Sequence, residues 1–405
     1  MKVAVIGAGF SGMYAAYLLE KKGYQVTIYE KEEQIGGHCK TILSKDVYTE
    51  IGTIFSFSNK IKELLIDLKV EYQERFIYRH FIDKNYQEVE YMKREDVVLL
   101  MEELGRLKII NSTYKDSLNS LTYGQINKDL LIPFGQFAKK KSLPMVSALI
   151  SPLLSSFGFG NIDEIATYYV LKVFTVETIY AFIKGDKLLY LNKGMSELIR
   201  KLSLNISDIR YSLEVTNIEV TDNQVKVETL YGSDYFDKVL ITSKLPNNVI
   251  KDEVYNKIMN DIDTNPFFTC AYEVNNKDLV TTYFKSHFGL KEKMQFFHSC
   301  KHNGRRMVIT YTYGKISKEV IDSITSDLKQ VGVDIKQLIT IKQWYIFPHL
   351  RQHNLTEEYY KLIQDHQQSS PICLIGSLIT EPSIDKLYLS VKQSINTIFE
   401  NEKAA

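Results

Sequence analysis

The sequence predicts an α/β protein in which the chain leaves a βαβ-type domain and later returns to it. Residues 2–30 have the pattern of a strand, a glycine-rich turn, a helix and a second strand. Residues 75–189 lack this alternation, whereas short apolar strand patterns return near residues 238 and 372. A chain of 405 residues is also too long for one compact core, so we expect two domains.

The composition argues against several classes of protein. The chain is 44% hydrophobic and 24% charged, as is typical of soluble globular proteins. Its net charge of +1 gives no electrostatic reason to expect nucleic acid or acidic membranes as partners. The longest apolar stretch, residues 143–160, is too short and too interrupted by prolines for a transmembrane segment. We expect it to form a buried helix pair or, alternatively, to line a channel for an apolar substrate.

The cysteines and the start of the chain carry further expectations. The four cysteines are widely spaced and form no CxxC pair, which argues against a zinc site and against a disulfide scaffold: Cys39, Cys270, Cys300 and Cys373. We therefore expect no metal and a reducing compartment. Because the first strand begins at residue 2, there is no room for a signal peptide, and we expect a cytoplasmic protein.

The N-terminal glycine-rich turn predicts a dinucleotide site. An apolar run of strand length precedes Gly7-Ala8-Gly9-Phe10-Ser11-Gly12, and a helical pattern follows it. In such a turn the first glycine allows the tight bend, the second lets a pyrophosphate approach the backbone, and the third lets the helix pack closely on the sheet. The helix N-terminus offers unpaired N–H groups to the phosphates. Glu30 ends the second strand, where a carboxylate can accept the ribose hydroxyls.

The residues after Glu30 favour FAD over a nicotinamide cofactor, because Gly36-Gly37 would let the flavin end run beneath this loop. With this pair the sequence resembles the FAD-dependent amine oxidase-like superfamily, which includes monoamine and amino-acid oxidases, phytoene desaturases and protoporphyrinogen oxidases. In that family a Gly-Gly-Arg segment follows the acid, whereas His38 stands at the arginine position here. The run Gly-Gly-His-Cys is most similar to the polyenoic fatty acid isomerase branch.

The resemblance implies an α/β fold with an FAD-binding Rossmann-like domain of the glutathione reductase type, an inserted α+β substrate-binding domain and a helical region. It assigns residues 1–74, 190–245 and 346–405 to the FAD-binding domain. Residues 75–189 and 246–345 then form the substrate-binding, or cap, domain.

The resemblance implies four later segments that contact FAD or pack on its domain: residues 48–55, 189–198, 215 and 372–377. Lys193 replaces the first glycine of the family's Gly-Gly-Met signature, and Ser377 replaces an acid in the last motif. The backbone at residue 215 would contact the adenine, although it could equally be a plain strand end. The implied cofactor contacts are Gly7, Gly9, Phe10, Ser11, Gly12, Glu30, Lys31, Gly37, His38, Gly52, Thr53, Ile54, Val215, Gly376, Ser377 and Ile384.

Periodicity predicts the elements of the two excursions from the FAD-binding domain. We expect a hairpin over residues 76–91 and helices over 59–68, 95–110, 123–141, 317–331 and 384–399. Strand patterns cover residues 217–220, 224–230, 238–242, 267–274, 294–298, 307–313 and 372–375. The second excursion should be a mixed sheet flanked by helices that forms one wall of the active site.

The candidates on the substrate side are few. Arg79 or Arg75 could hold a carboxylate bidentately, although surface ion pairs are the commoner fate of such arginines. Trp344 and Phe347 belong to an aromatic-Pro segment that the resemblance places near the flavin, with a core cluster as the alternative. The histidines nearest the motifs, His38, His80 and His349, are expected to be structural or to contact phosphate rather than to act as bases.

The resemblance implies an FAD-dependent oxidoreductase or isomerase in which flavin N5 takes a hydride from an apolar substrate that carries a carboxylate or an amine. Our first hypothesis is a redox-neutral double-bond isomerisation of a polyunsaturated fatty acid. The alternatives are an amine or amino-acid oxidase that uses O2, a carotenoid-type desaturase, and a flavin-binding protein without turnover. The oxidase would usually need a lysine near N5, which the sequence does not identify.

Overall fold

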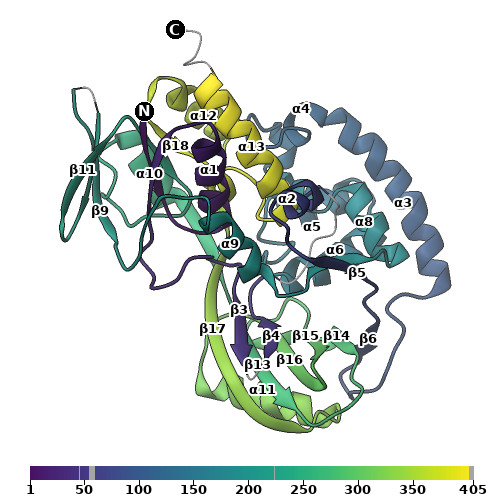
Figure 1. The fold of residues 1–405 in the computed structure, drawn as a ribbon. Helices are drawn as coiled ribbons and strands as arrows, with labels where there is room; N and C mark the ends of the chain where they lie inside the picture. Colours follow the sequence, from purple (N-terminus) through teal and green to yellow (C-terminus); the bar gives the residue numbers. More distant parts are fainter. Residues whose placement is uncertain (45, 54–59, 223, 401–405) are drawn as a thin grey trace.

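The computed structural model describes residues 1–44, 46–53, 60–222 and 224–400 (Figure 1). A five-stranded parallel sheet joins strands from both ends and from the middle of the chain. The strand order is β18-β12-β1-β2-β8. The strands are β1 (Lys2–Ile6), β2 (Gln25–Tyr29), β8 (Asp208–Arg210), β12 (Lys238–Ile241) and β18 (Ile372–Leu374). Because β1 pairs with β2 on one side and β12 on the other, the sheet reverses its winding direction beside β1. Open α/β sheets bind their ligands at the carboxyl ends of the strands at such a point.

Both faces of this sheet are covered, as buried parallel strands require. Val3 and Val5 of β1 pack toward α1 (Phe10–Lys21), α9 (Met195–Ser203) and α13 (Ile384–Glu400). Ala4 and Ile6 belong to a second core, which they share with a small antiparallel sheet. That sheet consists of β9 (Val215–Val220), β10 (Val225–Thr229) and β11 (Gly232–Phe236). Successive side chains of β1 therefore point to opposite faces of the sheet, and each face is covered by a layer from a different part of the sequence.

A helical region extends the second core (Figure 1). Its elements are α3 (Arg94–Thr113), α4 (Lys115–Leu118), η1 (Lys128–Leu130), α5 (Phe134–Lys140), α6 (Pro144–Ser156), α7 (Thr167–Val173) and α8 (Val176–Lys184). Two later helices, α10 (Glu253–Asp261) and α12 (Tyr359–Ser369), contribute to the same core. The most apolar of these helices, α6, buries Val146, Leu149, Ile150 and Leu154 completely.

The second main sheet has six strands in the order β17-β13-β16-β15-β14-β6 and lies at the bottom of Figure 1. Its strands are β6 (Arg79–Ile82), β13 (Ile262–Val274), β14 (Thr281–Phe284), β15 (Lys293–His302), β16 (Arg305–Tyr313) and β17 (Ile335–Leu350). One face packs on α11 (Lys318–Gln330). The other face packs on Val47 and Ile51, at and after the hairpin of β3 (Thr41–Ser44) and β4 (Val47–Glu50).

Short elements complete the described chain. The strands β5 (Tyr72–Arg75) and β7 (Leu188–Leu191) pair antiparallel and carry the chain into and out of the helical region. The helices α2 (Lys62–Asp67), η2 (Lys285–His287) and η3 (Gly376–Leu378) lie in the connections.

The expected fold class is confirmed, and the local expectations are met in part. The predicted mixed sheet of the second excursion and the helices over residues 317–331 and 384–399 are present. The helix expected over residues 123–141 is wrong, because that segment is interrupted at Pro133 and forms only η1 and α5. Residues 143–160 contain one helix, α6 (Pro144–Ser156), rather than a pair. Residue 346, where we expected the chain to re-enter the first domain, lies inside the continuous strand β17.

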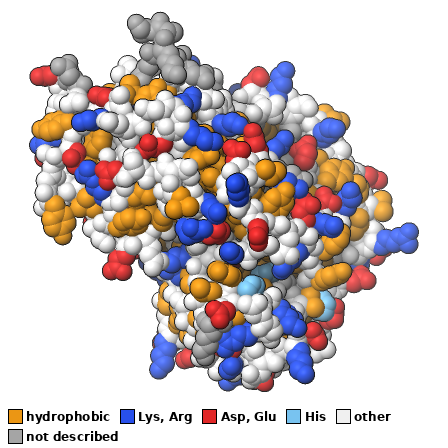
Figure 2. Space-filling model, in the orientation of Figure 1, with side chains coloured by type: hydrophobic (Ala, Val, Ile, Leu, Met, Phe, Trp, Pro, Cys, Tyr) orange, Lys and Arg blue, Asp and Glu red, His pale blue; other side chains and the backbone are white. Residues whose placement is uncertain are grey.

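The surface carries both charge signs in alternation with apolar side chains, and neither sign dominates the face in Figure 2. This agrees with the net charge of +1. Among the described residues, no helix combines the length and the apolar character needed to cross a bilayer. No group of three or more His, Cys, Asp or Glu side chains in this part of the chain is arranged to hold a metal ion.

Gly194, which precedes α9, should tolerate no side chain. It has φ +79°, and an added Cβ would lie 2.1 Å from Glu50 Oε1 and 2.3 Å from Thr41 Oγ1. We expect Gly194→Ala to lower the free energy of unfolding by about 3 kcal/mol or more, because strain and a clash act together. Gly185→Ala is the matched control, since φ is +69° but no atom lies within 4 Å, and about 1 kcal/mol is expected. Equal urea midpoints for the two variants would contradict this packing.

Candidate functional site

The turn between β1 and α1 has the geometry that the glycine pattern predicts. Gly7 has φ +102°, which favours glycine, and its N–H donates to the Tyr29 carbonyl at 2.8 Å. A Cβ on Gly12 would lie 2.0 Å from the Gly7 carbonyl oxygen, so α1 can start this close to the turn only with glycine there. Phe10 and Ser11 are buried in the first turn of α1, where the N–H groups have no acceptor four residues earlier.

Gly9 lies at the N-terminus of α1 with open space beside it. Its backbone is extended, with φ −72° and ψ 179°, and no side chain caps the helix. An added Cβ would meet only the Gly37 Cα, at 4.0 Å, and Gly9 forms a bridge with Gly36. The exposed Gly37 thus lies opposite the uncapped helix end. These residues fit a pyrophosphate group, because unpaired N–H groups and free volume occur at the same place.

Glu30 is buried at the edge of this turn, and backbone donors orient its carboxylate. Oε2 accepts from the Ala8 N–H at 2.8 Å, and Oε1 accepts from the Glu32 N–H at 2.9 Å. Each oxygen keeps a second lone pair for a hydroxyl group. The Leu213 N–H donates to the Glu30 carbonyl at 2.8 Å, and this places the start of β9, with the buried Val215, close to the acid. Lys31 is exposed.

The C-terminal motif returns to the same helix end. A Cβ on Gly376 would lie 2.5 Å from Ser11 Oγ, so η3 lies directly against the first turn of α1. Ser377 follows in η3 and is half-buried. Residues expected at opposite ends of the chain therefore meet at one point.

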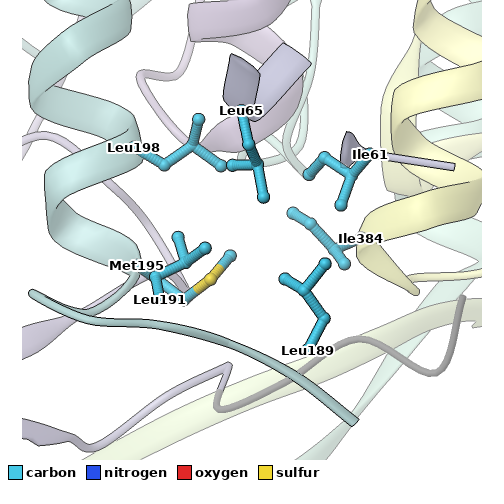
Figure 3. Close-up of a pocket in the computed structure, with 7 residues that line it drawn as sticks. All are labelled: Ile61, Leu65, Leu189, Leu191, Met195, Leu198 and Ile384. Atoms are coloured by element: carbon cyan, nitrogen blue, oxygen red, sulfur yellow. The ribbon is translucent and has the colours of Figure 1, made fainter. Parts of the chain in front are cut away.

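Ile384, the first residue of α13, has its side chain in a separate apolar cavity (Figure 3). The cavity has room for about one water-sized sphere, about 10 Å³, and has no polar lining. Its walls are Ile61, Leu65, Leu189, Leu191, Met195, Leu198 and Ile384. The side chain of Ile384 thus packs between α2, β7 and α9, and only its backbone, at the start of α13, is left for contact with a cofactor.

Gly52 and Thr53 form the third segment of the site. The Thr53 N–H donates to the His38 carbonyl at 2.8 Å, and a Cβ on Gly52 would lie 2.0 Å from the same oxygen. On the other side, Thr269 Oγ1 of β13 donates to the Ile51 carbonyl at 2.8 Å. This segment therefore joins the glycine pair to the six-stranded sheet. Ile54, also expected to contact the cofactor, lies outside the described residues.

His38 is an uncharged replacement for the arginine of the resemblance. His38 is exposed, but protein groups lie close to its ring. Desolvation by these groups lowers the pKa of the imidazole to about 4; a hydrogen bond to the Tyr345 backbone opposes the shift and the charge of Lys342 adds to it. The ring meets the Trp344 ring edge-on at 5.5 Å. At neutral pH His38 can exchange hydrogen bonds with a ligand but cannot supply positive charge.

The two aromatic candidates differ in their surroundings. Trp344 faces His38, and its Nε1–H donates to Thr269 Oγ1 at 3.1 Å, so it supports the Gly52 segment. Phe347 is completely buried, with its ring 5.1 Å from Phe159 and 5.8 Å from Tyr169. The Phe347 ring therefore belongs to the core in this structure, which was the alternative for this segment.

The other histidines have structural contacts. His349 is buried, its Nδ1 lies 2.7 Å from the Phe347 carbonyl oxygen, and its ring stacks on Phe347. His80 is exposed, and its Nε2 lies 3.9 Å from Glu88.

Arg79 lies at one edge of the sheet face that packs on β4. Its guanidinium is 4.4 Å from the centre of the Phe182 ring. Its Nε is buried and has no hydrogen-bond partner among the described residues. Burial raises the pKa of the nearby Tyr283 phenol, and the Arg79 charge opposes that rise. Arg75, by contrast, is exposed, with its guanidinium 6.0 Å from the Tyr190 ring.

A row of stacked aromatic rings crosses this sheet face from the Arg79 edge. Phe81, Tyr283, Phe296 and Tyr311 lie opposite one another on β6, β14, β15 and β16. Neighbouring ring centres are 5.2, 4.7 and 4.4 Å apart. The wall is thus apolar apart from two phenolic hydroxyls.

Several polar groups around this wall were not identified from the sequence. His298 is buried, and its Nδ1 shares a hydrogen bond of 3.0 Å with Thr281 Oγ1. Desolvation lowers the pKa of its imidazole to about 4. Glu50 is a buried carboxyl two residues before Gly52. The alternation of apolar and polar residues along β15 and β16 could have indicated His298 and Tyr311, but no motif marks them.

Comparison with known proteins agrees with this arrangement. Residues 5–68 match the NAD(P)-binding Rossmann-like domain family. An L-amino-acid oxidase of Crotalus adamanteus is 43% identical over 51 residues, 13% of this chain. That match covers 10% of the oxidase, so the chain aligns with about a tenth of the length of such curated relatives.

Solved structures match almost the whole chain. A CLA-producing fatty acid isomerase from P. acnes superposes with a TM-score of 0.88 over 98% of both chains, at 19% identity. A cyclohexylamine oxidase from Brevibacterium oxydans superposes with a TM-score of 0.76 over 99% of both chains, at 13% identity. The chain therefore has the fold of the FAD-dependent amine oxidase-like superfamily, as the resemblance implies.

His38 and His298 should stay neutral across the physiological pH range. Because the pKa of each is lowered to about 4, the unfolded chain binds more protons than the folded one between pH 4 and 6.5, and stability falls as pH drops through this window. We expect two imidazole NMR signals, assigned with His38→Gln and His298→Gln, to show no titration from pH 5 to 8. A midpoint near 6.5 for either would contradict the desolvation described.

Proposed function

We propose that this protein is an FAD-dependent flavoenzyme that isomerises a double bond of a polyunsaturated fatty acid. When bound, the flavin would accept a hydride at N5 from the apolar substrate and return it at another carbon. The observation that carries the substrate assignment is the part-buried guanidinium of Arg79 at the edge of a row of stacked aromatic rings.

The cofactor assignment is supported by the meeting of three glycine segments. Gly9, Gly37 and Gly376 lie around the uncapped end of α1, and Gly52 continues from there toward the six-stranded sheet. A nicotinamide cofactor would not need the Gly36-Gly37 loop or the return of the C-terminal motif to Ser11. We propose that Glu30 holds the ribose, that Gly9 and the α1 N-terminus hold the pyrophosphate, and that Gly52, Thr53 and the start of α13 border the flavin.

The substrate assignment is supported by charge and packing. A fatty acid needs one carboxylate anchor and a long apolar contact surface. Arg79 can offer paired donors to a carboxylate, and its buried Nε is a donor without a partner among the described residues. The row from Phe81 to Tyr311 would supply apolar contact and exclude water. These residues would bind and orient the chain without taking part in proton transfer.

The full-length likeness to the fatty acid isomerase supports the same proposal at the level of the fold. We propose the domain division on this basis, with residues 1–74, 190–245 and 346–405 binding FAD and residues 75–189 and 246–345 forming the cap. A cytoplasmic location remains part of the proposal.

An amine or amino-acid oxidase is the second candidate, and one observation favours it. Lys342 of β17 is close enough to His38 for its charge to lower the imidazole pKa, so a lysine does lie near the proposed flavin border. The ring of Trp344 is 5.7 Å from its Nζ. The carotenoid-type desaturase and a flavin-binding protein without turnover have no comparable support in the site.

The visible spectrum under anaerobic conditions separates these candidates. We expect the purified protein to be yellow and to give a conjugated-diene absorbance with linoleic acid while the flavin spectrum shows no net reduction. Bleaching by amines, with peroxide formed on reoxygenation, would support the oxidase instead. A colourless protein that takes up no FAD would contradict every flavin assignment.

Arg79→Met should weaken substrate binding selectively. Loss of a charge-assisted pair of about 1.5–3 kcal/mol corresponds to a rise of about 10- to 100-fold in KM for the free acid. The methyl ester should be much less affected, because it has no carboxylate. Arg75→Met is the matched control, since Arg75 is exposed, and steady-state kinetics should show little change. A larger rise in KM for Arg75→Met than for Arg79→Met would instead show that Arg75 binds the carboxylate.

Gly9→Leu should fold but fail to retain FAD. The backbone at Gly9 suits any residue and its Cβ direction is open, so the apoprotein should unfold at nearly the parent temperature. The new side chain would occupy the proposed pyrophosphate position. Gly105→Leu, on α3 with no atom within 4 Å, is the control that should remain yellow. FAD affinity unchanged in Gly9→Leu would show that the phosphates lie elsewhere.

A further inference from the structure

Glu50 ends β4 and joins three elements through one of its two carboxylate oxygens. Oε1 accepts from Thr41 Oγ1 at 2.6 Å and from the Met195 N–H, at the start of α9, at 2.5 Å. Thr41 Oγ1 in turn accepts from the Ser196 N–H at 3.0 Å. Two residues of the β3–β4 hairpin thus cap a helix that lies about 145 residues later in the chain.

The second oxygen of Glu50 has no such role. Oε2 is buried and has no hydrogen-bond partner among the described residues. The Tyr311 hydroxyl on β16 is also buried without a partner among them. Strand β4 contacts β16, so both groups lie at the boundary between β4 and the six-stranded sheet. Burial raises the pKa of the Tyr311 phenol, and the Glu50 charge adds to the rise.

The surroundings disfavour a negative charge on Glu50. Its neighbours are Cys39 before β3, Cys300 on β15 and Tyr311 on β16, and the Glu50 charge raises the pKa of each. Among the described residues no lysine or arginine forms an ion pair with Glu50. Desolvation therefore raises the pKa of its carboxyl to about 7, while the hydrogen bonds from Thr41 and Met195 limit the rise.

We propose that Glu50 is a positioning residue that pairs with Tyr311 through one bridging water molecule, and so fixes the cofactor-facing segment to the substrate-facing sheet. The inference rests on the proposed function, because Gly52 and Thr53 are the residues that Glu50 positions beside the flavin. Only Ile51 separates Glu50 from Gly52, and its carbonyl accepts a hydrogen bond from Thr269 Oγ1. A change in the protonation of Glu50 would alter the hydrogen bond to Tyr311 and hence the contact between the two walls of the site.

The sign of the pH effect follows from the direction of the shift. The folded state holds the Glu50 proton more tightly than the unfolded chain does, so this stabilisation is complete below pH 4.5 and is lost as pH rises through about 7. Glu50→Gln should remove the dependence, because the amide keeps an acceptor for α9 and offers Tyr311 a neutral donor. Glu50→Ala should lose the cap as well.

The test uses the full chain with Glu50→Gln, Tyr311→Phe, the double variant and the control Tyr313→Phe. Tyr313 lies on the same strand and face as Tyr311 and is similarly buried. The melting temperature of the parent apoprotein should fall between pH 6 and 8 more steeply than that of Glu50→Gln. The effects of Glu50→Gln and Tyr311→Phe should be non-additive, whereas those of Glu50→Gln and Tyr313→Phe should add.

FAD titration provides the second readout. Glu50→Gln should keep FAD affinity within about threefold of the parent at pH 8, whereas Glu50→Ala should lose at least about tenfold. Identical pH profiles for the parent and Glu50→Gln, or additive Glu50 and Tyr311 effects, would overturn the pairing. If the parent itself takes up no FAD, the proposed function fails, while the melting temperatures of the apoprotein still decide whether Glu50 and Tyr311 are coupled.

Discussion

The close approach of backbone segments at the N-terminus of α1 is the constraint on which the rest of the structure depends. Gly12 reaches the Gly7 carbonyl, Gly37 reaches Gly9, and Gly376 reaches Ser11, each at a distance that a side chain would prevent. These contacts join residues from the first forty and the last thirty of the chain at a single helix end. The free N–H groups of that end and the open space beside Gly9 then define where an anionic cofactor can lie.

The segment from Glu50 to Thr53 connects this arrangement to the six-stranded sheet. It is held by hydrogen bonds on both sides: the Thr53 and Ile51 N–H groups donate to the His38 and Lys40 carbonyls, and Thr269 Oγ1 of β13 donates to the Ile51 carbonyl. Trp344 reinforces the second connection through the Thr269 hydroxyl. A few short contacts thus set the position of the aromatic wall relative to the uncapped end of α1.

The sequence predicted those parts of the site that depend on backbone geometry. Glycines at positions 7, 12, 52 and 376 lie where an added Cβ would be less than 3 Å from another atom, whereas Gly9 leaves open space beside the end of α1. Side chains whose role depends on contacts with distant parts of the chain leave no comparable spacing pattern in the sequence. The Phe347 ring lies in the core, which was the alternative interpretation of its segment, and Glu50 was overlooked because Met195, whose N–H donates to it, is distant in sequence. The helix expected over residues 123–141 failed for a local reason, since Pro133 interrupts the segment between η1 and α5.

Comparative titration of the apoprotein with FAD and FMN tests the central claim most directly, because Glu30 and the α1 turn would hold the half of the dinucleotide that FMN lacks. Isothermal titration should give one FAD per chain and at least about 100-fold weaker binding of FMN, equivalent to about 2.7 kcal/mol of lost contacts. Equal affinities for FAD and FMN, or tighter binding of NAD than of FAD, would contradict the proposed course of the cofactor from Glu30 past Gly9 to Gly52.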